Sequence, residues 1–180
     1  MPAMKPQGWD LAAWGLALYL GASLLSALAP GVGLLSLVGL VVFFVGLYQI
    51  GQATGRMQVF TDQLIGRLLL WVGGFLILLV FGGLALFGAF ADGNDGGVLL
   101  GSALLGWLLF WLLSIASGWF TRRGYKALAE VSGRPLFNLA GDLIFWGSVA
   151  GLLIVGYVVA FAGEVVALVA FFNPPPSKME

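Results

Sequence analysis

Residues 137–172 read FNLAGDLIFWGSVAGLLIVGYVVAFAGEVVALVAFF, a stretch with no lysine or arginine that still carries two carboxylates, Asp142 and Glu164. As one unbroken α-helix it would extend about 54 Å at about 1.5 Å per residue, whereas the hydrocarbon core of a bilayer is about 30 Å thick. A single simple span is therefore excluded. Because Gly156 lies near the middle, the stretch predicts two short helices folded back on each other, the last hairpin of a polytopic membrane protein.

The composition of the whole chain supports the membrane class. With 61% hydrophobic and 9% charged residues, the 180-residue chain has more apolar surface than a soluble core of that length can enclose. Eight basic and eight acidic residues balance to a net charge of zero, which argues against nucleic acid as a partner. Membrane lipids are the expected surroundings.

The absence of cysteine and histidine narrows the possible chemistry. Disulfides, thiolate nucleophiles, the usual nitrogen and sulfur ligands of zinc and haem, and a Ser-His-Asp arrangement are all excluded. Only hard oxygen chemistry from carboxylates and backbone carbonyls remains. We therefore expect no enzymatic activity, no cofactor and no metal site.

Apolar runs and their breaks predict an all-α transmembrane bundle. A polar head (residues 1–10) precedes a single transmembrane domain (residues 11–172), and a polar, proline-rich tail (residues 173–180) follows it. The first run is interpreted as a retained span rather than a signal peptide, because Pro30 would directly follow the cleavage site. The six predicted spans are residues 11–29, 34–50, 68–90, 98–120, 137–154 and 157–172.

The connections between these spans are short. Residues 51–67 mix charged and apolar side chains, which fits either a helix lying in the membrane interface or an ordinary loop. Residues 92–97, DGNDGG, predict a solvated turn. Residues 121–134 are the most basic segment and predict a cytoplasmic amphipathic linker between spans four and five.

The charge distribution predicts the orientation. If the N-terminus is cytoplasmic and there are six spans, every lysine and arginine of the chain falls on the inner side, as the positive-inside rule requires. Five spans would place Lys178 outside. We therefore expect a multi-pass protein of the cytoplasmic membrane with both termini inside.

Two short strings resemble each other. Residues 54–60 (TGRMQVF) and residues 132–137 (SGRPLF) each follow an even-numbered span, so the two copies share one orientation. Such a parallel repeat occurs in some transporters, although chance similarity in so biased a composition is the alternative.

Small and aromatic residues suggest helix packing. Gly147 and Gly151, like Gly97 and Gly101, are four residues apart, which lets helix backbones approach closely within the bundle or between copies of the chain. Trp107 and Trp111 lie near the middle of span four and share one helix face. They fit a packed internal or subunit-facing surface, with a ligand-binding aromatic box as the alternative.

The two carboxylates of the last hairpin are the candidate polar site. Glu164 is expected near the midplane, where no basic residue is expected at the same depth, so desolvation favours a neutral acid hydrogen-bonded to a neighbouring helix. Proton or cation handling is the alternative. Asp142 is expected about 8 Å into span five, where Arg134 or Arg67 could reach it as an interfacial ion pair. If Asp142 instead faces Glu164, the two acids mark a path from the cytoplasm to mid-membrane.

A basic rim is predicted on the inner side, where it would attract anionic lipid headgroups. The positive-inside rule alone explains this rim equally well. The candidate lipid contacts are Arg122, Arg123, Lys126, Arg134, Arg56 and Arg67.

Three strings resemble a known family. They are APGVG at residues 29–33, LAEVSG at residues 128–133, and the ending from Gly163-Glu164 to AFF at residues 170–172. Together they resemble the domain-of-unknown-function family 996, small prokaryotic integral membrane proteins. The resemblance implies a multi-spanning bundle in a prokaryotic cytoplasmic membrane, and it brings no known substrate, cofactor or catalytic residue.

Two functions fit these features better than a third, an enzyme acting on lipids, in which only carboxylates could do the acid-base work because histidine and cysteine are absent. The first is a non-enzymatic accessory or scaffolding protein that packs with itself or with other membrane subunits through its glycine-rich helix faces. The second is a small transporter or channel that moves protons or cations past Glu164 and Asp142.

Overall fold

The computed structural model describes residues 8–26, 28–84, 86, 96–153 and 155–173. All regular structure in this part of the chain is helical, in six helices with short connections. They are α1 (Trp9–Ser26), α2 (Gly33–Thr54), the helix that runs through α3 (Gln58–Leu68) and α4 (Gly74–Ile77), α6 (Gly96–Ser132), α7 (Leu136–Val149) and α8 (Val155–Phe172).

Short helical turns join or interrupt these helices. A 3₁₀ turn, Pro30–Val32, precedes α2, and another, Ala150–Leu152, follows α7. Two π-helical stretches, Leu69–Gly73 and Leu78–Gly82, flank α4 without breaking its helix. Four helices among the described residues are long and apolar enough to cross a membrane: Gly33–Thr54, Gln58–Gly82, Leu100–Ser132 and Val155–Phe172.

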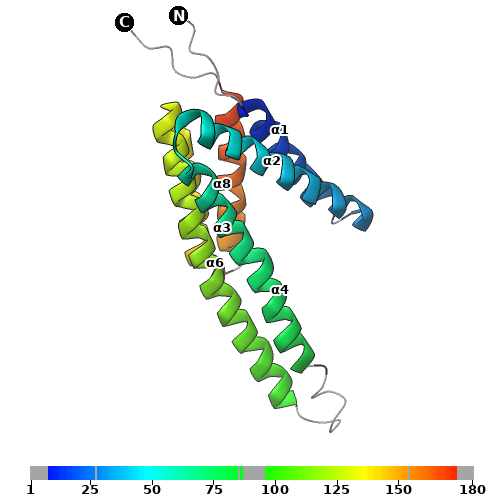
Figure 1. Cartoon of the computed structure of the whole chain (residues 1–180). Coiled ribbons are helices and arrows are strands. Elements are labelled where there is room, and N and C mark those ends of the chain that lie inside the picture. The colour runs from blue at the N-terminus through cyan, green and yellow to red at the C-terminus, as the bar shows by residue number, and fades with distance from the viewer. Residues whose placement is uncertain (1–7, 27, 85, 87–95, 154, 174–180) are drawn as a thin grey trace, which may run out of the picture.

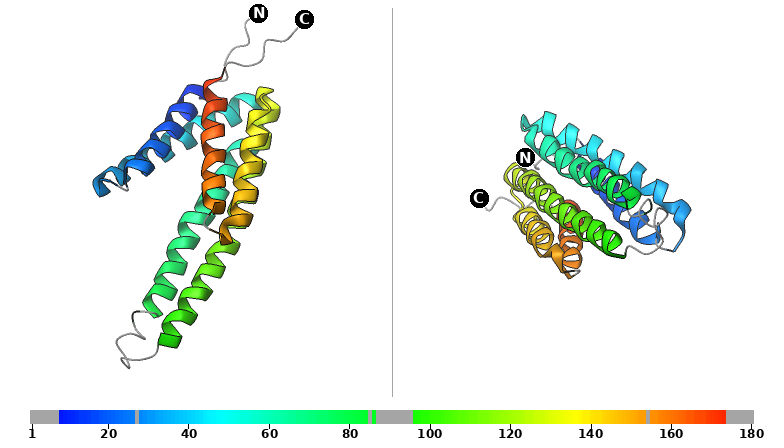
Figure 2. Two further views of the ribbon diagram at one scale, coloured as in Figure 1. Left: turned by 180° about the vertical axis from the view of Figure 1, so that it is seen from behind. Right: turned by 90° about the horizontal axis from the view of Figure 1, so that it is seen from below.

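The helices form two parts of different thickness (Figures 1 and 2). At one end, all six helices meet, and both ends of the described chain lie there. From this end the α1–α2 hairpin leans away to one side of the other helices. Beyond the turn between α7 and α8, only the α3–α4 helix and the first half of α6 continue, side by side. We call this second part the arm (residues 69–84 and 96–112).

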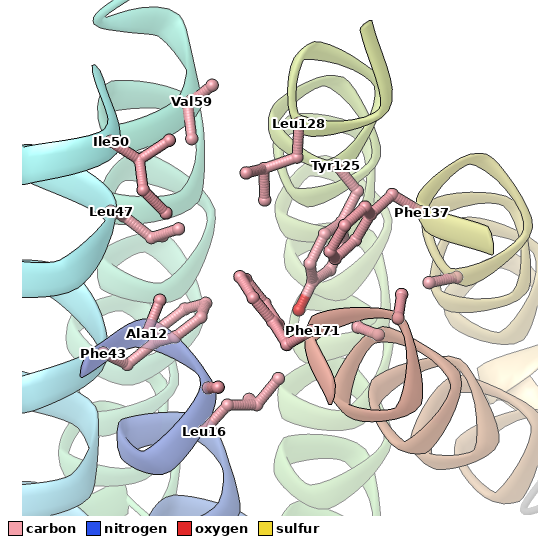
Figure 3. Packing of buried hydrophobic residues seen from close by; sticks show 14 of the residues in the cluster. Ala12, Leu16, Phe43, Leu47, Ile50, Val59, Tyr125, Leu128, Phe137 and Phe171 are labelled. Carbon is pink, nitrogen blue, oxygen red and sulfur yellow. The ribbon is translucent and has the colours of Figure 1, made fainter. Parts of the chain in front are cut away.

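The core lies entirely in the six-helix part. Its largest fully buried side chains are aromatic, and they come from α1, α2, α6, α7 and α8 (Figure 3). Phe137 packs edge-on against Phe171 with ring centroids 4.9 Å apart, and stacks on Tyr125 at 6.1 Å. Such aromatic contacts add to the burial of apolar surface.

Two predicted connections are in fact parts of longer helices. Residues 51–54 end α2, and residues 58–67 begin the helix predicted as span three, so neither an interfacial helix nor an ordinary loop describes this segment. The predicted basic linker, residues 121–134, is wrong as a separate element because α6 continues to Ser132. Tyr125 and Leu128 on this segment are fully buried, and their packing stabilises the extra helical turns.

Two glycines end helices in the same way. Gly55 follows α2 with φ 69°, and Gly133 follows α6 with φ 67°. This left-handed conformation is the usual helix C-terminal turn, and glycine adopts it without strain. Each glycine is followed by an arginine and then a new helix. The two repeated strings therefore have the same backbone pattern, while a duplication of larger segments stays a prediction.

The last hairpin turns slightly earlier than the sequence indicates. The turn lies before Val155, and Gly156 is already in α8. A Cβ at Gly156 would lie 2.2 Å from the backbone carbon of Ala150, so the close return of the chain requires glycine here. Predicted span three extends to residue 90. The structure describes it up to residue 84 and at residue 86, and residues 85 and 87–90 lie outside the described part of the chain.

Close backbone contact holds α1 against α2. A Cβ at Gly46 would lie 2.3 Å from the backbone nitrogen of Ala12, and one at Gly15 would lie 2.2 Å from that of Phe43. Small residues at such crossings are how helices associate where lipid gives no hydrophobic driving force.

We expect Gly46→Ala to destabilise the protein by about 1–3 kcal/mol, because the added methyl group overpacks the α1–α2 contact. Gly21→Ala is the matched control, since a Cβ at Gly21 has nothing within 4 Å. It should be neutral or stabilising by up to about 1 kcal/mol, because alanine favours helix. The free energy of unfolding in detergent, measured by titration with SDS, compares them. Equal effects of the two variants would contradict the packing described here.

Candidate functional site

Arg67 and Glu164 form a buried ion pair between α3 and α8. The Nη2 atom of Arg67 donates to both carboxylate oxygens of Glu164 at 2.9 Å. The side chains of Arg67 and Glu164 are only 8% and 16% exposed. The guanidinium also lies over the rings of Tyr19 and Phe43, at 5.1 and 5.2 Å from their centroids. Four helices therefore surround this charge.

Tyr125 of α6 completes the cluster. Its hydroxyl donates to Oε2 of Glu164 at 3.0 Å, and its side chain is fully buried. The carboxylate thus accepts hydrogen bonds from a cation and from a phenol, and hydrogen bonds between ionised groups are stronger than those between neutral groups. We call Arg67, Glu164 and Tyr125 the buried cluster.

Glu164 has the predicted hydrogen bond to a neighbouring helix, but the buried cluster corrects the prediction that no basic residue lies at its depth. That prediction is wrong because it follows from residues 51–67 being a connection at the membrane surface, which would keep Arg67 away from Glu164. In the structure α3 is the beginning of a long helix, and it brings Arg67 to the level of Glu164. The sequence does indicate this continuous helix, because residues 58–68 contain no proline and no pair of glycines and lead directly into span three.

Two polar atoms next to the cluster have no hydrogen-bond partner among the described residues. They are Oε1 of Gln63 and Nε of Arg67. The two residues are four apart on α3 and so share one helix face. The amide nitrogen of Gln63 donates to the carbonyl of Thr121 at 3.2 Å, which ties α3 to α6.

Asp142 binds a different arginine. Its Oδ1 accepts a hydrogen bond from Nε of Arg122 at 2.6 Å, and its side chain is 41% exposed. The predicted ion pair of Asp142 is therefore present, but the predicted partners, Arg134 and Arg67, were wrong. Asp142 and Glu164 bind separate arginines, so the structure does not join them in one site.

Most of the predicted basic rim is paired within the chain. Arg56 forms an ion pair with Glu130, and Nε of Arg123 lies 3.3 Å from Oδ2 of Asp62. Because each pair is neutral as a whole, its attraction for anionic lipid is weaker than that of a free arginine. Lys126 is partly buried. Lipid contact stays a prediction for Arg56, Arg122, Arg123 and Lys126.

Arg67 and Arg134 are buried, which contradicts their prediction as lipid contacts. Nη1 of Arg134 donates to the carbonyls of Ala170 and Phe171 at 2.5 and 3.2 Å, at the end of α8. These are carbonyls that a helix C-terminus leaves without intrahelical partners, and a cation there also complements the helix dipole. Burial lowers the pKa of the Arg134 guanidinium from its ordinary value, but arginine stays charged.

Trp9 joins the beginning of α1 to the same helix end. Its indole Nε1 donates to the carbonyl of Phe171 at 2.9 Å, and Arg134 lies 4.5 Å above its ring. Trp9 is almost fully buried, so it is a core residue rather than a membrane-interface anchor.

The predicted packing residues lie at the α7–α8 hairpin. A Cβ at Gly147 would lie 2.4 Å from the backbone nitrogen of Ala160, and one at Gly151 would lie 3.3 Å from the ring of Tyr157. Trp107 packs edge-on against Tyr157, and Nε1 of Trp111 donates to the carbonyl of Val149 at 3.0 Å. These four residues pack helices together within the chain. For Gly97 and Gly101 a Cβ would meet nothing within 4 Å.

The arrangement is that of a multi-helix membrane protein with internal ion pairs. Among the described residues there is no group of three His, Cys, Asp or Glu side chains that could hold a metal ion. The buried cluster consists of a fixed ion pair and a phenol, and its three side chains hold helices together.

The chain belongs to the family described as "Protein of unknown function (DUF996)", whose model matches residues 35–165. It is also similar to an uncharacterized protein of the archaeon Methanocaldococcus jannaschii, with 29% identity over 144 residues, covering 79% of this chain and 81% of that protein. No solved structure matches the chain. The resemblance read from the sequence is thus confirmed.

We expect Glu164→Gln to destabilise the protein by about 3–5 kcal/mol, because it leaves the buried Arg67 charge without its counter-ion. Glu130→Gln is the matched control, since Glu130 is also paired with an arginine but the two side chains are 63% and 52% exposed. It should cost no more than about 1 kcal/mol. Unfolding by SDS measures both. Similar losses in the two variants would show that burial of the Arg67–Glu164 pair is not what makes it important.

We expect Arg134→Gln to cost about 2–3 kcal/mol, because charged hydrogen bonds to the end of α8 and the contact with Trp9 are lost. Intrinsic tryptophan fluorescence and unfolding by SDS check this prediction. Arg123→Gln, at an arginine whose side chain is 47% exposed, is the control and should change stability by less than about 1 kcal/mol. A wild-type stability of the Arg134 variant would contradict its role as a helix cap.

Proposed function

We propose that this protein is a non-enzymatic accessory or scaffolding component of a prokaryotic cytoplasmic membrane. The observation that carries the proposal is the state of Glu164, the most deeply placed carboxylate of the last hairpin. It is held by Arg67 and Tyr125 in a tight contact between helices. A carboxylate fixed in this way stabilises a shape, whereas a transport site needs a carboxylate that exchanges its partner.

The surface supports the same function. Large apolar side chains cover the outside of the arm, including Phe75, Leu78, Leu100 and Leu104. In a membrane such a surface contacts lipid or the helices of neighbouring proteins. Membrane lipids, further copies of this chain and other membrane subunits are its expected partners.

The proposed orientation follows the charges. The α2–α3 and α6–α7 connections lie at the same end of the molecule as both ends of the described chain (Figure 1). Each connection contains a glycine followed by an arginine, Gly55-Arg56 and Gly133-Arg134. This end is cytoplasmic by the positive-inside rule. The six apolar segments then correspond to three hairpins that all start and end on the cytoplasmic side. Six complete crossings are the topology that the charges predict.

Proton or cation movement is the second candidate. It is favoured by the unpaired polar atoms of Gln63 and Arg67 beside Glu164, because polar atoms without partners in a membrane protein can belong to a hydrated path. In this alternative the Arg67–Glu164 pair opens and closes during transport, and Asp142 lies at the cytoplasmic entrance.

Flux measurements in vesicles distinguish the two functions. Wild type, Glu164→Gln and the Glu130→Gln control are reconstituted separately, and proton uptake is followed with an enclosed pH-sensitive dye under a potassium-driven membrane potential. Potassium and sodium uptake are measured in the same way with enclosed indicator dyes. The scaffolding function predicts the same flux as empty vesicles for all three proteins. A flux that is present in wild type and in Glu130→Gln but lost in Glu164→Gln would overturn it.

A further inference from the structure

The three hairpins differ in the chemistry of their turns. In the arm, the sequence that joins the α3–α4 helix to α6 includes DGNDGG, residues 92–97, with two aspartates. The sequence around the α1–α2 turn is ALAPGVGL, residues 27–34, and that around the α7–α8 turn is AGLLIVG, residues 150–156. Neither of these two turns contains a polar or charged side chain. A turn in water is typically polar, so the two apolar turns are suited to a different solvent.

The apolar turns are exposed to their surroundings rather than covered by protein. Leu153 and Leu28, one in each turn, are 70% and 85% exposed. Backbone amides at these turns nevertheless find partners among the described residues. The amide of Leu153 donates to the carbonyl of Ala150 at 2.9 Å, and that of Val32 to Ala29 at 2.9 Å. Internal pairing of backbone groups is what hydrocarbon requires.

Trp111 places the α7–α8 turn along α6. Its indole donates to the carbonyl of Val149, next to that turn. The charged residue of α6 nearest to the arm is Arg122. It lies eleven residues after Trp111, which is about 17 Å of helix at about 1.5 Å per residue. If the ion pair of Arg122 with Asp142 lies at the membrane surface, the turn lies about half-way through a hydrocarbon core about 30 Å thick.

The arm has the length for a complete crossing. From Arg122 back to Gly97 are 25 residues of α6, about 38 Å of helix, and no charged residue lies between them. The α3–α4 helix runs beside it to the same end. Both α1–α2 and α7–α8 end well short of that level in Figure 1 and in the left view of Figure 2.

We propose that the α1–α2 and α7–α8 hairpins insert into one leaflet only, from the side that carries the arginines, while the arm alone crosses the whole bilayer. The protein then has six helices in one leaflet and two in the other, which makes it a wedge. Its partner is the acyl region of the leaflet on the arginine side. This inference replaces six complete crossings by two, because it moves the α1–α2 and α7–α8 turns from the outer side into the bilayer. It leaves both termini and the arginine-bearing connections on their predicted side, and it does not depend on the accessory function.

Cysteine labelling tests the depth of the turns, and the chain has no cysteine of its own. The variants are Leu28→Cys and Leu153→Cys at the apolar turns, Gly97→Cys at the end of the arm, and Asn138→Cys near the start of α7. All four positions are exposed. Each variant is reconstituted in vesicles and treated with a charged, membrane-impermeant maleimide, first outside and then on both sides after the vesicles are opened. Labelling in SDS gives the total thiol.

We expect Gly97→Cys and Asn138→Cys to react from opposite sides. Leu28→Cys and Leu153→Cys should react at least tenfold more slowly from either side, and fully in SDS. The spin relaxation of a nitroxide attached to each of these two cysteines gives a second measure of depth. Oxygen, which enters lipid, should relax it more strongly than a water-soluble nickel chelate does. This result distinguishes a cysteine immersed in lipid from one made unreactive by misfolding.

Two results would overturn the wedge. Labelling of Leu28→Cys or Leu153→Cys from the Gly97 side would show that the hairpin crosses the bilayer. Labelling from the Asn138 side, or relaxation of the nitroxide mainly by the nickel chelate, would show that the turn is in water. A variant that does not elute as a single species in detergent is replaced by Leu34→Cys or Val155→Cys, which are 71% and 70% exposed.

Discussion

The Arg67–Glu164 ion pair is the interaction on which the arrangement of helices depends. It joins α3 to α8, Tyr125 adds α6, and the rings of Tyr19 and Phe43 bring in α1 and α2. A charge in an apolar chain is expensive unless it is paired, so each partner restricts where the other helix can lie. The aromatic core of Phe137 and Phe171 then packs on the same end of the bundle.

The same constraint sets the position of the molecule in the bilayer. Arg56, Glu130, Arg123 and Asp142 are all partly exposed at the six-helix end, and each would cost about 2.5–3.5 kcal/mol at the bilayer centre. The leucines of the arm are exposed at the other end, where each gains about 1.5–3 kcal/mol by leaving water. Both terms favour immersion of the arm, with the ion pairs at the surface.

The sequence was sufficient for the fold class and the hairpins, because long apolar runs broken by proline and glycine have few other solutions. It was not sufficient for the site. Charged residues between apolar runs look like surface loops, so the helical continuity of residues 58–82 and 96–132 was missed. The partners of Glu164 and Asp142 were missed as well, because the residues of these ion pairs are 97 and 20 positions apart and meet only through tertiary packing. The burial of Arg134 was missed for the same reason.

A double-mutant cycle on Arg67 and Glu164 tests the central claim most directly. The free energy of unfolding is measured for wild type, Arg67→Met, Glu164→Met and the double variant in the same detergent. The account predicts that each single change costs about 3–5 kcal/mol, and that the double change costs about 2–3 kcal/mol less than the sum of the two. Additivity of the two changes within about 0.5 kcal/mol would contradict it.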